Sequence, residues 1–451
     1  MSSYFASRAL LATGWKHAVR IEVDALGVIS SISDNSEAAG AITLPGSVIP
    51  AIANLHSHAF QRAMAGLAEV AGDPQDSFWT WRDLMYRMVQ RLSPQQVGDI
   101  ARHLYIDMLK GGYTQVAEFH YLHHDLNGAP YPQDEMLQQL IAAAEQVGIG
   151  QTLLPVLYSY AGFGAQPPQA GQKRFIQDAE RYLRQQENLS ALLQHKPLQN
   201  QGLCFHSLRA VSQQQMAEVL AASSASLPVH IHIAEQEKEV NDSLAWSGER
   251  PVNWLLDRFE VNSRWCLIHA THLDQGEIDR LARSGAVAGL CPTTEANLGD
   301  GIFPASDYIA QGGRWGIGSD SHVSLDVVEE LRWLEYAQRL RDRRRNRIVN
   351  PQQNSVGDLL YTQAAAGGAQ ACGVNIGTLA VGQRADWLVL EQDGWLDSCP
   401  DHALLNRWLF AGNRSQIRDV WVAGKQQIAA GQHALQAESD RRFAAVMKAL
   451  Q

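Results

Sequence analysis

The chain has 451 residues, of which 45% are hydrophobic and 19% are charged, and its formal net charge at pH 7 is −10. This composition is typical of a folded globular protein, and the length suffices for one large barrel with an accessory domain or for two ordinary domains. The negative charge argues against nucleic acid as the main partner, because proteins that bind nucleic acid present a basic face.

The sequence also argues against a membrane protein and against a disulfide-bonded one. Residues 1–6 contain no basic region followed by a sustained apolar stretch, and no apolar run approaches the ~20 residues of a membrane helix. The five cysteines are scattered and show no CxxC spacing, which predicts reduced thiols. We therefore expect a cytoplasmic protein that binds no membrane.

Strand and helix patterns alternate between residues 48 and 322. The expected strands are 49–55, 114–119, 151–158, 202–206, 228–233, 265–269, 286–290 and 315–319. The expected helices include 94–110, 133–147, 171–193, 212–222, 274–284 and 325–341. Strands that alternate with helices predict a parallel sheet, and eight such strands close a (β/α)8 TIM-like barrel. An open doubly wound sheet is the alternative, but no GxGxxG follows the first strand and polar residues lie at many strand ends.

The two ends of the chain differ from this middle part. Residues 8–48 and 378–430 have the pattern of short strands and turns. Two β-rich ends around a βα core predict that the termini pair with each other. We therefore expect an α/β fold with a distorted (β/α)8 barrel over residues 49–375 and a small β-sandwich domain built from residues 1–48 and 376–451.

Several expected strands end in residues that can bind a metal. His56 and His58 end the first strand, and they face the same way because side chains alternate along a strand. His232 ends the fifth strand, and Asp320 follows the eighth. The carboxyl ends of barrel strands meet at one rim, so we expect these four side chains to bind one divalent metal ion, with zinc as the expected metal. His230 lies deeper on the same strand face as His232 and is the weaker candidate.

Residues near the same strand ends can move protons. Glu235 lies just beyond the fifth strand, where a carboxylate can carry a proton from a metal-bound water to a leaving group. His269 ends the sixth strand and is the expected base, with His272 as its competitor, and Asp320 is expected to share this task. We interpret the nearby Glu239 as an ordinary solvated residue.

The lysines bear on the number of metal ions. A two-metal site of this class uses a carboxylated lysine from the middle of the barrel. Between residues 111 and 237 the only lysines are Lys173 and Lys196, and both lie in polar, helical or loop-like sequence. We therefore expect a single ion.

Longer motifs around these residues carry a family resemblance. The histidine pair, His232, His269 and Asp320, flanked by β-rich ends, resemble the amidohydrolase superfamily over essentially the whole chain. Within it, four segments are similar to the formimidoylglutamate deiminase family: 54–66, 77–82, 205–211 and 291–301. The first histidine pair is common to the superfamily, whereas the Trp-Thr-Trp-Arg and His-Ser-Leu-Arg segments are more particular.

The resemblance implies a reaction and a set of binding residues. Family members hydrolyse N-formimino-L-glutamate to N-formyl-L-glutamate and ammonia in histidine breakdown, so the expected partner is a small dicarboxylate amidine. Two carboxylates call for guanidinium groups, which bind planar oxyanions bidentately. The positions that match the family's substrate-binding residues are Gln61, Arg82, Tyr121, His206, Arg209 and His269. We also expect a homodimer, although no residue pattern carries that expectation.

Three alternatives stay open from the sequence. A deaminase of a purine, pyrimidine or triazine ring uses the same metal ligands, but a ring substrate would favour aromatic stacking and amide contacts over two arginines. A hydrolase of N-acyl amino acids would release an amino acid instead of ammonia. A catalytically inactive scaffold is disfavoured because the full set of expected ligands and proton carriers is present.

Overall fold

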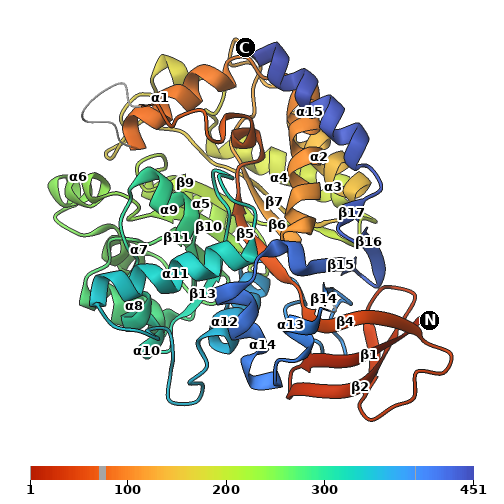
Figure 1. Ribbon diagram of the computed structural model, residues 1–451. Coiled ribbons are helices and arrows are strands. Elements are labelled where there is room, and N and C mark those ends of the chain that lie inside the picture. The colour runs from red at the N-terminus through yellow and green to blue at the C-terminus, as the bar shows by residue number, and fades with distance from the viewer. Residues whose placement is uncertain (1, 71–77, 392, 451) are drawn as a thin grey trace.

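A computed structural model describes residues 2–70, 78–391 and 393–450 of the chain. Strands ringed by helices form one part of the molecule, and a sheet made by both ends of the chain lies beside it at the lower right of Figure 1. Within these ranges, no helix is long and apolar enough to cross a membrane.

The terminal sheet joins the first and last parts of the chain in one hydrogen-bonded layer. Its strand order is β17-β16-β15-β14-β4-β1-β2-β3. The bounds are β1 (Ser2–Leu11), β2 (Gly14–Val23), β3 (Ile29–Ser33), β4 (Ile42–Pro50), β14 (Trp387–Glu391), β15 (Ile417–Val422), β16 (Lys425–Ala429) and β17 (Gln432–His433). Val48 on β4 pairs with Ala9 in parallel and with Val389 in antiparallel register, so β4 links the two chain ends.

The barrel consists of two parallel sheets, ordered β5-β6-β7-β8 and β13-β12-β11-β10-β9. The strands are β5 (Ile52–Ser57), β6 (Tyr113–His120), β7 (Gly150–Pro155), β8 (Gln199–Gln201), β9 (Leu203–Ser207), β10 (Val229–Ile233), β11 (Trp265–His269), β12 (Val287–Leu290) and β13 (Arg314–Ile317). Parallel bridges from Leu157 to Phe205 and from Ser57 to Asp320 join the two sheets on both sides. This closure confirms the expected distorted barrel.

The expected first strand, 49–55, is divided between two sheets. β4 ends at Pro50 in the terminal sheet, and β5 begins at Ile52 in the barrel. Ala51, between them, donates its N–H to the carbonyl of Asp386. The apolar run looks continuous in sequence because both strands are buried, so periodicity alone does not reveal the change of sheet.

The helices surround the barrel and extend beyond it. They are α1 (Phe78–Val89), α2 (Pro94–Lys110), α3 (Glu135–Val147), α4 (Ala179–Leu193), α5 (Gln213–Ala222), α6 (Glu237–Ser247), α7 (Pro251–Arg258), α8 (Gln275–Ser284), α9 (Pro292–Leu298), α10 (Ala305–Ala310), α11 (Val327–Asp342), α12 (Val356–Cys372), α13 (Gly394–Asp397), α14 (Asp401–Ala411) and α15 (Gln436–Leu450). Short 3-10 turns are η1 (Ala59–Met64), η2 (Ala170–Gln172) and η3 (Arg414–Gln416). α2 has the expected bounds because Ser93 and Gln96 form a capping box at its start.

The expected helix 171–193 begins later, at Ala179, where Asp178 caps α4 by accepting the N–H of Arg181. The residues before it serve a different purpose. Arg174 is fully buried and donates hydrogen bonds to the carbonyls of Val89, Leu92 and His124. This contact ties the carboxyl end of α1 to the barrel.

Two packing contacts fix the outer helices. In α12, a Cβ on Gly367 would lie 1.8 Å from the carbonyl oxygen of Trp315 on β13, so glycine permits this close approach. α15 lies beside α2, where Phe443 stacks on His103 with ring centroids 4.2 Å apart (Figure 1). The division into domains at residues 49 and 375 stays a prediction.

Candidate metal centre and active site

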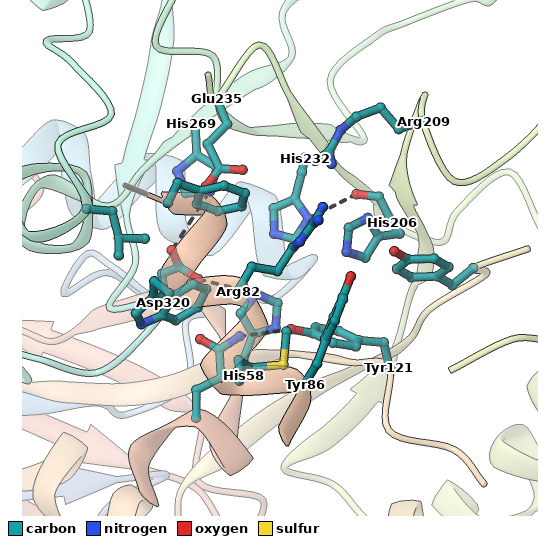
Figure 2. A pocket seen from close by; sticks show the side chains of 16 residues that line it. His58, Arg82, Tyr86, Tyr121, His206, Arg209, His232, Glu235, His269 and Asp320 are labelled. Carbon is teal, nitrogen blue, oxygen red and sulfur yellow. Dashed lines mark hydrogen bonds and ion pairs between the residues drawn. The ribbon is translucent and has the colours of Figure 1, made fainter. Parts of the chain in front are cut away.

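The four predicted metal ligands lie together at the carboxyl ends of three barrel strands. His56 and His58 come from β5, His232 from β10 and Asp320 from the residues after β13. Nε2 of His56 lies 3.0 Å from Nε2 of His232. Oδ1 of Asp320 lies 3.3 Å from Nε2 of both His56 and His58. Figure 2 shows three of these side chains converging from separate strands.

Backbone carbonyls fix which nitrogen of two rings faces this centre. Nδ1 of His58 donates to the carbonyl of Phe119 at 2.7 Å, and Nδ1 of His232 donates to the carbonyl of His206 at 2.9 Å. In a neutral imidazole the other nitrogen then carries a free lone pair. Burial lowers the pKa of His56 to about 3 and holds the pKa of His232 well below its usual range. The two rings are therefore neutral at pH 7, as metal binding requires.

The spacing of these atoms fits a divalent cation. Ligands about 2.0–2.1 Å from a tetrahedral ion stand about 3.3–3.4 Å apart. The distances of 3.0 and 3.3 Å between the ligand atoms are close to that value. Imidazole nitrogens and a carboxylate are ligands that borderline divalent metals accept. The three histidines and Asp320 are therefore placed where they could hold a divalent cation.

A buried hydrogen-bond network that we did not predict holds the segments that carry His58 and Asp320. Glu118 on β6 accepts the hydroxyl of Ser57 at 2.7 Å and the N–H of Ala59 at 2.6 Å, on either side of His58. Asn54 donates to the hydroxyl of Ser319 at 2.6 Å, next to Asp320. Burial raises the pKa of Glu118 to about 7. The serines beside the ligands were the available signal, but their partners are distant in sequence: Glu118 on β6 is 61 positions from Ser57, and Asn54 on β5 is 265 positions from Ser319.

Glu235 and His269 lie beside the metal ligands. Nε2 of His269 is 3.8 Å from Oε1 of Glu235 and 3.8 Å from Oδ2 of Asp320. Burial raises the pKa of Glu235 to about 7. Burial opposes a charge on His269, but Glu235, Glu295 and Asp320 outweigh it and raise its pKa to about 10. Groups whose pKa values lie near or above neutrality can exchange protons with a bound water.

Glu239 corrects one expectation. We interpreted it as a solvated residue, yet it is only 1% exposed. Its carboxylate accepts the backbone N–H groups of Ala234 and Glu235, each at 3.2 Å. Ala234 has a positive φ of 51°, a conformation that needs support in a residue with a side chain. Glu239 therefore holds the turn that presents Glu235.

The competing histidines lie elsewhere. Nε2 of His230 bonds to the carbonyl of Ala371 at 2.8 Å, on the far side of the strand end. Nε2 of His272 bonds to the carbonyl of Asp300 at 2.8 Å. These rings have structural partners, whereas Nε2 of His232 lies 3.0 Å from His56 and Nε2 of His269 lies 3.8 Å from Asp320.

A pocket opens beside the four predicted metal ligands. The residues expected to bind substrate all line it: Gln61, Arg82, Tyr121, His206, Arg209 and His269. Nε2 of Gln61 donates to the Tyr121 hydroxyl at 2.9 Å. Sequence reasoning missed Tyr86 and Tyr158, which line the same pocket. Tyr86 is labelled in Figure 2.

Two guanidinium groups enter this pocket from different elements. Arg82 comes from α1, and Arg209 follows β9. Among the residues that the structure describes, the Nε atoms of both are buried without a hydrogen-bond partner. Both guanidinium groups lie near the ring of Trp79, at 4.7 and 5.9 Å from its centroid. Half-buried guanidinium groups whose Nε–H has no partner favour an anionic ligand. Ser77, the first residue of the motif that contains Arg82, lies outside the described residues.

The sequence matches two family descriptions. Residues 47–426 match "Amidohydrolase family", and residues 1–42 match "Formimidoylglutamate deiminase HutF, N-terminal domain". A curated relative, the formimidoylglutamate deiminase of Pseudomonas aeruginosa, is 61% identical over 449 residues, which cover 99% of this chain and 99% of the relative.

Solved structures agree with this match. A crystal structure of an amidohydrolase from Brucella melitensis is 45% identical, with a TM-score of 0.95 and 100% of both chains covered. A zinc-bound adenosine deaminase from Xanthomonas campestris is 23% identical, with a TM-score of 0.80 and 99% and 98% of the two chains covered. The second likeness concerns the fold alone.

Proposed function

The chain belongs to the amidohydrolase family, and we propose that it hydrolyses N-formimino-L-glutamate to N-formyl-L-glutamate and ammonia. The substrate is an amidine that carries two carboxylates. Water adds to the formimino carbon, the bond from that carbon to the terminal nitrogen breaks, and the nitrogen leaves as ammonia.

The observation that carries this proposal is the pair of guanidinium groups, each with an unpartnered Nε–H, that share one pocket with the predicted metal ligands. Arg82 and Arg209 line the same cavity as His232, Glu235 and Asp320. A ligand with carboxylates at one end and an amidine at the other can contact the two arginines and the predicted metal ligands at the same time. The planar guanidinium group matches a carboxylate bidentately, so the two arginines support a dicarboxylate substrate.

We propose that His56, His58, His232 and Asp320 hold a single zinc ion. When bound, the ion supplies a water whose pKa falls toward about 7 and a positive charge that lowers the pKa of neighbouring acids and bases such as His269. Lys173 is exposed and Lys196 pairs with Glu145 at 2.6 Å, so neither lysine supports a second ion.

The chain's own residues then move the protons. Nε2 of His269 lies 3.8 Å from Oδ2 of Asp320, and these two groups would accept the proton of the attacking water as its oxygen adds to the formimino carbon. Glu235, with a pKa near 7, hands a proton to the departing nitrogen. A carboxyl group whose pKa lies near the working pH serves both to accept and to donate. Gln61, Tyr121 and His206 are placed to orient the formimino group or a carboxylate.

Assay of ammonia release tests the proposal. Zinc-loaded protein should release ammonia from N-formimino-L-glutamate, and N-formimino-L-aspartate serves as a length control. Guanine, cytosine and adenosine test the ring-deaminase alternative in the same assay. Faster release from a ring substrate would contradict the proposal. The homodimer and the cytoplasmic location expected from the sequence stay predictions, and light scattering of the purified protein tests the first.

A further inference from the structure

Glu295 is a buried carboxylate that the proposed mechanism leaves without a role. It lies on α9, directly after β12, and only 5% of its surface is exposed. Its Oε1 accepts the backbone N–H of Cys291 at 2.9 Å and lies 3.3 Å from Nδ1 of His269. Because the backbone bond holds the carboxylate in place, it offers His269 a fixed hydrogen-bond acceptor.

The ring of His269 spans the distance between this carboxylate and the reacting groups. Nδ1 faces Glu295, whereas Nε2 faces Glu235 and Asp320, each at 3.8 Å. A neutral imidazole has one N–H and one lone pair, and the hydrogen bond that one nitrogen makes decides which is which. An acceptor at Nδ1 therefore leaves the lone pair on Nε2, which faces Glu235 and Asp320.

The backbone at this point does not orient the ring without help. His269 has a φ of +69° and the next residue, Ala270, a φ of +48°. Such left-handed conformations are strained in residues with side chains and persist where surrounding contacts hold them. Ala270 donates to the carbonyl of Ile233 at 3.0 Å, which holds the backbone, and Glu295 holds the side chain.

We infer that Glu295 is a positioning residue, which keeps the proton of His269 on Nδ1 and directs Nε2 at the reacting water. The inference rests on the proposed function, because it serves the proton step described there. When Nε2 accepts the proton of the water, the ring carries an N–H at both nitrogens, with the Glu295 carboxylate against Nδ1. The proton then leaves Nε2 toward Glu235 and the departing nitrogen.

Two substitutions separate the hydrogen bond from the charge. Glu295→Ala removes the acceptor. Glu295→Gln keeps an oxygen at the position of Oε1, because the Cys291 N–H needs an acceptor there, but it removes the negative charge. Glu330→Gln is the matched control: Glu330 is also fully buried, but it accepts the N–H and hydroxyl of Thr293 on α9 instead of facing His269.

The experiment measures kcat and KM for N-formimino-L-glutamate, bound zinc, and the downfield proton NMR resonance of a histidine Nδ1–H that is bonded to a carboxylate. We expect Glu295→Ala to lower kcat about 10²-fold or more, with KM within about twofold, because an orienting carboxylate acts on the transition state. Zinc should stay bound and the resonance should disappear. The kcat of Glu295→Gln should be at least about tenfold higher than that of Glu295→Ala. The resonance should remain in Glu295→Gln, but at a shifted position. Glu330→Gln should leave kcat and the resonance as in the wild type.

Several results would overturn the inference. The inference is wrong if Glu295→Ala keeps a kcat within about twofold of wild type. It is also wrong if the resonance survives in that variant, or if the variant loses zinc in parallel with activity. If Glu295→Ala does not fold, an unshifted resonance in Glu295→Gln would overturn the inference and a shifted one would support it. A wild-type protein that releases no ammonia from N-formimino-L-glutamate would contradict the proposed function instead, and the resonance would still test the contact between Glu295 and His269.

Discussion

Nε2 of His56 and Nε2 of His232 lie 3.0 Å apart, although 176 residues separate them in the chain. The two rings come from β5 and β10, which belong to different sheets of the barrel. Nδ1 of His232 is committed to a carbonyl, so its lone pair points at His56 and needs a proton or a cation between them. Closure of the barrel therefore brings the proposed metal ligands together, and the proposed chemistry depends on that closure.

His232→Asn should abolish metal binding, whereas His230→Asn on the same strand should not. His232 contributes a nitrogen to the site, and His230 bonds to the carbonyl of Ala371. Loss of a ligand should weaken zinc affinity by more than the roughly 10–100-fold that loss of a supporting residue costs. Zinc content after gel filtration, measured by atomic absorption, checks this. Equal zinc in the two variants would contradict the ligand assignment.

Glu235→Gln should lower kcat by about 10²–10⁴-fold, the usual contribution of a positioned proton carrier. Zinc should stay bound, because Glu235 is not among the metal ligands. Glu237→Gln is the control, since Glu237 is an exposed carboxylate two residues away on α6. Steady-state ammonia release and zinc content check both variants. A Glu235→Gln protein with wild-type kcat would remove Glu235 from the mechanism.

The same residue should make stability depend on pH. Burial raises the pKa of Glu235 from 4.5 to about 7, so the folded protein holds this proton at pH values where the unfolded chain has released it. The free energy of unfolding therefore falls as pH rises from about 4.5 to about 7, by up to about 3 kcal/mol at 1.36 kcal/mol per pH unit.

Glu235→Gln should lack the contribution of Glu235 to this slope, whereas Glu118, whose pKa burial also raises to about 7, keeps its own contribution. Urea unfolding of the metal-free proteins at pH 5 and pH 8 measures the difference, and Glu237→Gln should keep the wild-type slope. If wild type and Glu235→Gln lose the same stability between these pH values, Glu235 is not the buried group that titrates.

Arg82→Met and Arg209→Met should mainly raise KM. A charge-assisted hydrogen bond contributes about 1.5–3 kcal/mol, so the loss of either guanidinium group should raise KM about 10–100-fold for N-formimino-L-glutamate. Zinc content should not change. Arg184→Met is the control, because Arg184 forms a surface ion pair with Glu180.

A neutral formamidine without carboxylates separates binding from chemistry in these variants. Its kcat/KM should be the same in wild type, Arg82→Met and Arg209→Met, because it offers the arginines no carboxylate. Losses on formamidine equal to those on N-formimino-L-glutamate would mean that the arginines support the fold or the metal site instead of binding carboxylates.

The sequence predicted the parts of the site that follow from local pattern. Alternation along a strand placed His56 and His58 on one face, and apolar runs marked β10 and the strand before Asp320. These features depend on a few neighbouring residues. Because the carboxyl ends of barrel strands converge at one rim, the residues that end these strands are brought together. The family resemblance, and not the residue pattern, singled out Arg82 and Arg209 among the many arginines.

The parts that we could not predict depend on contacts between distant segments. Glu239 looks like its exposed neighbour Glu237, and only the turn at Ala234 makes it a buried acceptor. The support that Glu118 gives to Ser57 joins residues 61 positions apart. The place of α1 above the pocket depends on Arg174, which bonds to the carbonyl of Val89 across 85 positions. Hydrogen bonds of this range leave no periodic signal in sequence.

In the proposed mechanism, three imidazoles and Asp320 hold a cation that activates water against the formimino carbon, while the two arginines bind the carboxylates of the substrate. The most direct measurement is the rate of ammonia release from N-formimino-L-glutamate by one protein sample, first stripped of metal with a chelator and then reloaded with zinc. We predict no turnover in the stripped protein, unchanged circular dichroism, and recovery of turnover at one zinc per chain. Turnover that persists in the stripped protein, or fails to return with zinc bound, would contradict the account.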